Sequence, residues 1–257
     1  MITSNQNAKL KLARSLMGRS RERRAAGAFV AEGVRLVEEA LSAGWPIRFV
    51  LYTEGLSGRG LELITRLESQ GCEVEQVSEV LLNSVSETET SQGLLAVLDY
   101  SPLALPQPLD FVFIPDSIRD PGNLGTLLRT AAAAGVQAVF LPPETTDAFA
   151  PKVLRAGMGA HFRLPIHSLG WEDIYVATRA LKVYLADMQG SPCWQMDFSQ
   201  PLALIVGGEA EGATDEARRL ADMSVSIPMP GRAESLNAGV AGAILMFEVV
   251  RQRKMGK

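Results

Sequence analysis

The segment PDSIRDPGNLGTLLRTAAAAG, residues 115 to 135, places an arginine in an unusual setting. It opens like a turn and continues as an alanine-rich helix, in which Arg129 is the charged residue, six positions after Asn123. A guanidinium among leucines and alanines needs a cavity or an anion as its partner, unless its stem follows the surface and its charge stays in water. Asn123 either caps the helix or faces a cleft. The segment is a candidate ligand loop, with an ordinary turn as the alternative.

Two later loops have glycines where a ligand could approach the backbone. IVGGEAEGAT leaves an apolar strand through Gly207 and Gly208 and then offers Glu209. SIPMPGRAESLNAGVAGAIL crosses a proline-flanked loop and enters a long helix at about Ser235 to Asn237. The small residues that follow permit close approach of a neighbouring element or a second subunit. The first loop carries neither the dinucleotide fingerprint nor a phosphate loop, which weighs against nicotinamide and nucleoside-triphosphate enzymes.

The elements around these loops predict a parallel sheet. Continuous apolar runs alternate with helical patterns after residue 110, and the strands we expect are FVFIPD, AVFLPP, HFRLPIH, KVYLAD, LALIVGG and SVSIPM, with a helix at the end. Such runs are typical of strands covered on both faces. Ligands bind at the carboxyl ends of strands in these sheets. The loops after FVFIPD, LALIVGG and SVSIPM are therefore the ones expected to carry chemistry.

A proline-rich stretch divides the chain into two predicted domains. SPLALPQPL, residues 101 to 109, holds three prolines and fits neither a helix nor a central strand, so we interpret it as a linker. Residues 1–100 form a small α/β unit, with helices over FVAEGVRLVEEALSAG and GLELITRLES and strands over IRFVLYT, CEVEQV and GLLAVLD. Residues 110–257 form the second domain. The predicted fold class is α/β.

Composition indicates a soluble, cytoplasmic protein. The 257 residues are 47% hydrophobic and 21% charged, and we find neither a secretory signal nor an apolar run long enough to cross a membrane. Cys72 and Cys193 lie far apart, and two histidines complete the set of soft ligands, so neither a metal site nor a disulfide framework is expected.

Charge is unevenly distributed along the chain. The net charge is −4, yet residues 1–30 hold seven bases and one acid. The seven bases are Lys9, Lys11, Arg14, Arg19, Arg21, Arg23 and Arg24. Clustered bases can neutralise phosphates and release counterions, which would make them an RNA-binding surface. The alternative is an ordinary solvated helix face.

Taken together, the three loops resemble the three motifs of the SpoU (TrmH-type) RNA ribose 2′-O-methyltransferases. The first motif reads N-x5-R from Asn123 to Arg129, the second G-x-E-x-x-G from Gly207 to Gly212, and the third SIPM…SLN ending at Asn237. The resemblance extends to KVLRAGMGAHFRLPI and to the substrate-binding domain at the front, so it covers nearly the whole chain. Gly157, Gly208 and Ser91 depart from the residues usual in the family.

This resemblance implies a fold, a cofactor and a set of site residues. The fold would be a parallel-sheet domain with a deep trefoil knot, preceded by a domain resembling ribosomal RNA-binding proteins. S-adenosyl-L-methionine would lie in the knot, and the enzyme would be a homodimer. The residues implied to bind the cofactor are Gly207, Ile227, Met229, Leu236 and Asn237. The residues implied to be catalytic are Asn123 and Arg129 at the target ribose, Glu209, which would brace the loops or pair with Arg129, and Ser235 and Asn237, which would hold the cofactor and the active-site backbone.

The implied reaction is methyl transfer to a ribose 2′-hydroxyl of structured RNA. Because an arginine rarely loses its proton, Arg129 is expected to contact the ribose or its phosphate rather than to act as a simple base. A 23S ribosomal RNA substrate is favoured and transfer RNA remains an alternative. A non-catalytic RNA-binding or assembly module of the same fold is the other alternative.

Overall fold

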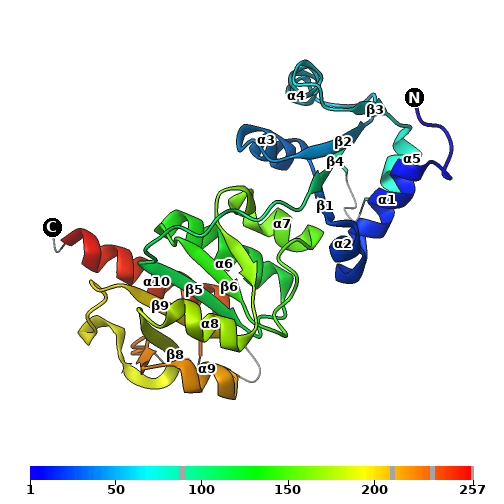
Figure 1. Cartoon of the computed structure of the whole chain (residues 1–257). Coiled ribbons are helices and arrows are strands. Elements are labelled where there is room, and N and C mark those ends of the chain that lie inside the picture. The colour runs from blue at the N-terminus through cyan, green and yellow to red at the C-terminus, as the bar shows by residue number, and fades with distance from the viewer. Residues whose placement is uncertain (87–90, 209–211, 232–234, 256–257) are drawn as a thin grey trace. The chain divides into compact units, whose positions relative to one another are not determined.

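The computed structural model describes residues 1–86, 91–208, 212–231 and 235–255 (Figure 1). The chain forms two compact units. The first contains Met1–Ser101 together with Phe149–Phe162, and the second contains Pro102–Ala148 and Arg163–Lys257. The first unit thus differs from the predicted segment 1–100 by including residues 149–162.

The first unit is built on a four-stranded mixed sheet. Its strand order is β1-β4-β2-β3, in which β4 runs antiparallel to both neighbours and β2 and β3 are parallel. Its elements are α1 (Ala8–Met17), α2 (Ser20–Ala26), β1 (Ala28–Glu32), α3 (Val34–Ser42), β2 (Ile47–Tyr52), α4 (Gly58–Ser69), β3 (Val74–Gln76), α5 (Glu79–Asn83), β4 (Leu94–Asp99), α7 (Pro151–Gly157) and the 3₁₀ turn η1 (Ala160–Phe162).

One predicted helix of the first unit begins later than expected. FVAE, which we included in a helix, forms the strand β1 and pairs antiparallel with β4 from Ala28 to Glu32. All five residues of β1 are buried, so they gain more from sheet pairing and burial on both faces than from a helical pattern. Gly33, with φ 101°, turns the chain into α3, which starts at Val34.

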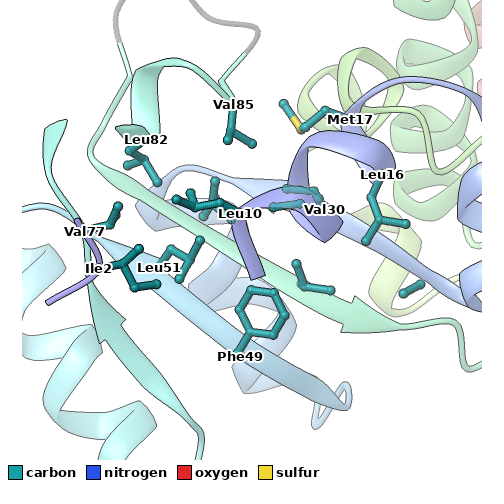
Figure 2. Packing of buried hydrophobic residues seen from close by; sticks show 14 residues of the cluster. Ile2, Leu10, Leu16, Met17, Val30, Phe49, Leu51, Val77, Leu82 and Val85 are labelled. Carbon is teal, nitrogen blue, oxygen red and sulfur yellow. The ribbon is translucent and has the colours of Figure 1, made fainter. Parts of the chain in front are cut away.

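A hydrophobic cluster between α1 and the sheet forms a core of the first unit (Figure 2). Leu10 and Leu16 of α1 are fully buried and lie against Val30, Phe49 and neighbouring strand residues. Burial of such side chains contributes roughly 1.5–3 kcal/mol each. The apolar face of this basic helix is therefore committed to the core, and its charged residues are confined to the remaining surface.

Aromatic packing explains why residues 149–162 belong to the first unit. The ring of Phe149 lies 4.8 Å from that of Phe29, and the ring of Phe162 lies 5.4 Å from that of Trp45. Arg155 of α7 approaches the buried carboxylate of Glu32 at 3.7 Å. The sequence reads these residues as part of the second domain because they follow its strand AVFLPP, and local patterns do not reveal such long-range contacts.

The second unit is built on a six-stranded parallel sheet, as expected from the apolar runs. Its strand order is β10-β8-β9-β5-β6-β7, and every neighbouring pair is parallel. Its elements are β5 (Phe111–Asp116), α6 (Pro121–Ala134), β6 (Ala138–Leu141), β7 (Ile166–Ser168), α8 (Trp171–Thr178), β8 (Lys182–Pro192), the 3₁₀ turn η2 (Cys193–Gln195), β9 (Leu202–Gly207), α9 (Asp215–Leu220), β10 (Met223–Ser226) and α10 (Ala238–Met255).

Helices cover both faces of this sheet. The side chains of Ile205 and Ala217 share a buried cluster with residues of α8, so α8 and α9 cover one face. Successive strand residues point to opposite faces, and Val206 accordingly lies beside α10, which packs against β9 and α6. None of the helices in the described parts of the chain has the length and apolarity needed to cross a bilayer.

One predicted strand of the second unit is shorter than expected, and the proline-rich segment has no regular secondary structure. The predicted strand HFRLPIH is shorter, because Ala160–Phe162 forms a 3₁₀ turn that packs in the first unit and β7 starts only at Ile166. Residues 101–109 form neither helix nor strand, as their prolines predict.

Candidate functional site

The N-cap of α6 holds Asn123 in place, and this cap is a different residue, Asp120. Asp120 is the N-cap of α6 and accepts the backbone N–H of Asn123 at 2.7 Å, while Pro121 occupies the first helical position. The sequence left open whether Asn123 caps the helix or faces a cleft. Because Asp120 is the cap, the side chain of Asn123 is available for a different partner.

That partner is Asn237 of the third loop. The side-chain nitrogen of Asn237 donates to Asn123 Oδ1 at 2.9 Å, and its oxygen accepts the N–H of Val240 at 3.2 Å at the start of α10. The fold thus brings together two residues, from α6 and from the loop before α10, that the resemblance places in one site.

The second loop leaves β9 under tight packing. An ideal Cβ on Gly208 would lie 2.6 Å from the carbonyl oxygen of Ser117, so a side chain there would require the backbone to move. This contact gives a physical reason for glycine at this position. Glu209, the acidic residue predicted in this loop, lies outside the described residues.

The far end of the second loop is held by a buried carboxylate. Asp116 ends β5, is fully buried, and accepts the N–H of Thr214 at 2.7 Å. Thr214 in turn caps α9 by accepting from Ala217. Burial raises the pKa of Asp116, and the hydrogen bond from Thr214 opposes that shift in part. The carboxylate therefore links the end of β5 to the start of α9, the helix that follows the neighbouring strand β9.

A cavity of about 800 Å³ opens at the carboxyl end of β9 and along residues 186–189 of β8. This volume lies in the range of small-molecule and cofactor sites, roughly 300–1,000 Å³. Its lining includes every residue predicted to bind the cofactor, and also Ser235. These lining residues are Gly207, Ile227, Met229, Ser235, Leu236 and Asn237. The predicted residues, spread over 31 positions of the sequence, thus line one cavity.

Arg129 lies on the exposed side of α6 and not in the lining of this cavity. It follows Thr126 and precedes Ala133 on one exposed helical stripe, at the spacing of successive turns. The setting of Arg129 is therefore an open surface of small side chains. Within one chain, the fold joins Asn123 to Asn237, which lines the cavity, and leaves the arginine exposed on the same helix as Asn123.

Comparison with known proteins places this arrangement in a family. A profile of the SpoU rRNA Methylase family matches residues 110–247, which is more than half of the chain. A profile of the MRM3-like substrate binding domain matches residues 7–96. The chain belongs to the SpoU rRNA methylase family.

Three proteins similar to this SpoU family member match it over nearly their whole length. The 23S rRNA (guanosine(2553)-2′-O)-methyltransferase RlmP of Bacillus subtilis is 35% identical, over 96% of this chain and 98% of its own. The crystal structure of the SpoU methyltransferase AviRb from Streptomyces viridochromogenes, in complex with AdoMet, superposes with a TM-score of 0.87 at 31% identity, covering 98% of this chain and 100% of its own. The AdoMet-bound rRNA methyltransferase from Sinorhizobium meliloti gives a TM-score of 0.84 at 33% identity, covering 97% of each chain.

The sequence prediction for this SpoU protein missed one wall of the cavity. Asp187, Met188 and Gln189, at the end of the predicted strand KVYLAD, line it, as does Arg218 of α9. A signal was present, because the carboxyl ends of parallel strands are the expected ligand positions and this strand ends on an aspartate. The strand was recognised, but the segment MQGSP after it, which contains Gly190, was not considered as a ligand loop.

The seven bases predicted to bind RNA fall into two groups in the first unit. Three take part in contacts within the unit: Lys9 pairs with Glu73 at 2.6 Å and with Glu75, Arg14 donates to Asn5 and Ser84, and the buried Arg23 donates to two backbone carbonyls. The other four are exposed on α1, on α2 or between them, and these are Lys11, Arg19, Arg21 and Arg24.

Proposed function

We propose that this protein transfers a methyl group from S-adenosyl-L-methionine to a ribose 2′-hydroxyl of structured RNA, with 23S ribosomal RNA as the substrate. The observation that carries the proposal is the hydrogen bond from Asn237, which lines the 800 Å³ cavity, to Asn123 of α6. It joins the first and third motifs of a SpoU family chain whose relatives include proteins named as 23S rRNA 2′-O-methyltransferases. The trefoil knot stays a prediction.

The cavity suits the cofactor in size and chemistry. Val206, Ile227, Leu236 and Leu245 give it apolar walls, and the backbone of Gly207 and Gly208 lines it at the end of β9. An adenine ring is flat and apolar on its faces and has polar atoms at its edge, so it is matched by apolar walls and backbone groups. When bound, S-adenosylmethionine supplies a methyl group on a positively charged sulfur.

The residues near the cavity have different roles in positioning and activating the target ribose. A ribose hydroxyl is a weak nucleophile, so the site must hold it in line with the methyl group and assist the departure of its proton. Asn123, fixed by Asn237, positions the ribose, and Ser235 helps to hold the third loop. Arg129 contacts the ribose or its phosphate as a permanent cation. Glu209 braces the second loop or pairs with Arg129.

We further propose that two copies form the working enzyme. Leu236, Val240 and Phe247 at α10 expose 36%, 47% and 49% of their surface, and Val240 and Phe247 share a helical face. The neighbouring stripe of α6 presents Thr126, Arg129 and Ala133. A second copy covering both helices would bury the apolar side chains and bring Arg129 close to a cavity of the dimer.

The dimer is tested by molar mass. Light scattering should give twice the chain mass for the wild type and the monomer mass for Val240→Glu and Phe247→Glu. Val80→Glu is the matched control, because Val80 is an apolar residue of α5 with 80% of its surface exposed. A wild type that stays monomeric at concentrations supporting turnover overturns the dimer.

The exposed bases of the first unit are proposed to grip RNA phosphates. Lys11, Arg19, Arg21 and Arg24 carry this role, because their charges face solvent and phosphate contacts release counterions. Lys9, Arg14 and Arg23 stabilise the unit through their contacts within it.

The activity is tested by transfer of a labelled methyl group. The protein is incubated with tritiated S-adenosylmethionine and either 23S ribosomal RNA or transfer RNA, and labelled positions are mapped as 2′-O-methyl nucleotides. Label in 23S ribosomal RNA supports the proposal, and label in transfer RNA alone assigns the other substrate. Cofactor binding without transfer to either RNA, together with RNA binding that ignores the cofactor, would identify a non-catalytic module.

A further inference from the structure

An interruption in β8 brings a charged pair to the cavity. In the pairing of β8 with β10, Leu185 lies opposite Ser224 and Ser191 lies opposite Val225, so residues 186–190 leave the regular register. The pairing of β8 with β9 also ends at Leu185. Ala186 to Gln189 line the cavity, and Ser226 Oγ anchors the returning chain by donating to the carbonyl of Gly190 at 2.8 Å.

Within this excursion the carboxylate of Asp187 is held in a fixed orientation. Its Oδ2 accepts from Arg218 Nη1 at 2.7 Å, and its Oδ1 accepts the N–H of Gln189 at 2.9 Å. These contacts, the backbone hydrogen bond first, lower the pKa of Asp187, so the group is a carboxylate at neutral pH. Each carboxylate oxygen can accept two hydrogen bonds. Asp187 therefore keeps acceptor capacity, and 18% of its side chain remains exposed.

The rest of the cavity wall makes this carboxylate distinctive. Among the described lining residues, Asp187 and Arg218 are the charged ones, and the others are apolar, small or neutral polar. A purely structural ion pair on the surface contributes little, about 0–1 kcal/mol. A carboxylate next to an apolar cleft is instead suited to a ligand group that offers hydrogen-bond donors.

The sheet order indicates which part of the methyl donor faces Asp187. The donor has two groups with N–H or O–H donors besides the adenine: the vicinal hydroxyls of its ribose and the ammonium of its amino acid tail. Asn123 follows β5, whereas Asp187 belongs to β8, and β9 separates these strands. Strands lie about 4.8 Å apart, so β5 and β8 lie about 10 Å apart across the sheet. The reacting sulfur belongs on the β5 side, with Asn123, so we assign Asp187 on the β8 side to the adenosine half of the donor.

We propose that Asp187 binds the ribose diol of the adenosine part of the methyl donor, with Arg218 as the residue that positions it. This inference rests on the proposed function, since it assumes that the cavity takes S-adenosylmethionine. A carboxylate at the end of a parallel strand binds ribose hydroxyls in the same chemical manner in dinucleotide-binding folds. The two donors of a diol match the acceptor-only character of a carboxylate.

Calorimetry with modified ligands tests the assignment. S-adenosylhomocysteine and its 2′-deoxy and 3′-deoxy counterparts are titrated into the wild type and into Asp187→Ala. In the wild type we expect loss of a bound hydroxyl to weaken binding by about 10-fold or more, as for a hydrogen bond to a charged group. In Asp187→Ala we expect S-adenosylhomocysteine to weaken by a similar factor and the deoxy ligands to bind as well as the parent ligand. This loss of discrimination is the signature of direct contact.

Two controls distinguish the loss of a ligand contact from a general change in charge and from unfolding. Glu216 pairs with Arg219 of α9, and neither residue lines the cavity. Glu216→Gln removes the charge of this carboxylate and should leave all affinities unchanged. Unfolding midpoints verify that each variant is folded. If Asp187→Ala discriminates against the deoxy ligands as strongly as the wild type does, the assignment is overturned.

Two further outcomes are distinct. If Asp187→Ala weakens S-adenosylhomocysteine but not 5′-methylthioadenosine, which keeps the ribose and lacks the amino acid tail, Asp187 contacts the tail and the diol assignment is overturned. If the folded wild type binds none of these ligands, the proposed function fails as well.

Discussion

The side-chain nitrogen of Asn237 donates a 2.9 Å hydrogen bond to Asn123 Oδ1, although 114 residues separate the two in the chain. The oxygen of the same Asn237 amide accepts from Val240 at the start of α10. The capping bond thus fixes which end of the amide faces Asn123. One side chain stabilises the helix start and orients a residue of the first motif.

Replacing Asn237 by Asp separates these two tasks. Asp keeps an oxygen that can cap α10 but loses the donor to Asn123, so we expect the free energy of unfolding to stay within about 0.5 kcal/mol of wild type. Methyl transfer should fall about 3- to 10-fold, the value of one hydrogen bond. Asn237→Ala should lose transfer similarly and cost about 1 kcal/mol of stability. Urea unfolding and labelled-methyl transfer measure both, and unchanged transfer in Asn237→Asp would refute the coupling.

Substitution of Arg129 should impair transfer without impairing cofactor binding. Because Arg129 is exposed on α6 and does not line the cavity, Arg129→Ala should bind S-adenosylmethionine with wild-type affinity. Transfer should fall by about 10- to 100-fold, since a hydrogen bond to a charged group is lost. Arg179→Ala, at an exposed arginine ending α8, is the matched control. Equal turnover by Arg129→Ala would exclude the proposed role.

Replacing two neighbouring arginines of α2, Arg23 and Arg24, should have opposite effects on stability and on RNA binding. Arg23 is buried and donates to the carbonyls of Leu16 at 2.8 Å and Gly18 at 2.9 Å, so Arg23→Ala should destabilise the protein by about 1–3 kcal/mol. Arg24 is exposed, and Arg24→Ala should change stability by less than about 0.5 kcal/mol. It should instead weaken RNA binding. The slope of the logarithm of the affinity against the logarithm of the salt concentration should become shallower by nearly one. Filter binding at several salt concentrations measures this, and an unchanged salt slope would argue against phosphate contact.

The buried Asp116 should make stability depend on pH. Burial raises its pKa in the folded protein, so the folded state holds this proton to a higher pH than the unfolded state does. The contribution of this group to the free energy of unfolding therefore falls as pH rises from about 4 through the raised value. Asn at this position keeps an oxygen for the N–H of Thr214 and carries no charge.

Asp116→Asn should accordingly gain stability relative to wild type as pH increases from 4 to 8. Asp116→Ala, which leaves the N–H of Thr214 without this acceptor, should lose about 1–3 kcal/mol. Urea unfolding of the three proteins across this pH range provides the measurement. A difference between wild type and Asp116→Asn that does not change with pH would contradict a raised pKa.

The sequence by itself determined the α/β class, the parallel second sheet and two of the loops that line the cavity. These features are local, because continuous apolar runs, helix starts and glycine turns leave their signals within a few residues. Local patterns also explain the main errors. FVAE follows a helical pattern in the sequence but forms β1, since its burial comes from β4, more than sixty residues later.

Tertiary structure alone decided which of the candidate residues meet. It joined Asn123 to Asn237, turned Arg129 outward, and used Arg23 as a buried hydrogen-bond donor. It also brought Asp187 of β8 and Arg218 of α9 to one cavity wall. Contacts of this kind depend on strand order and register, and these are set by packing between segments that are distant in sequence. No short stretch of the chain encodes them on its own.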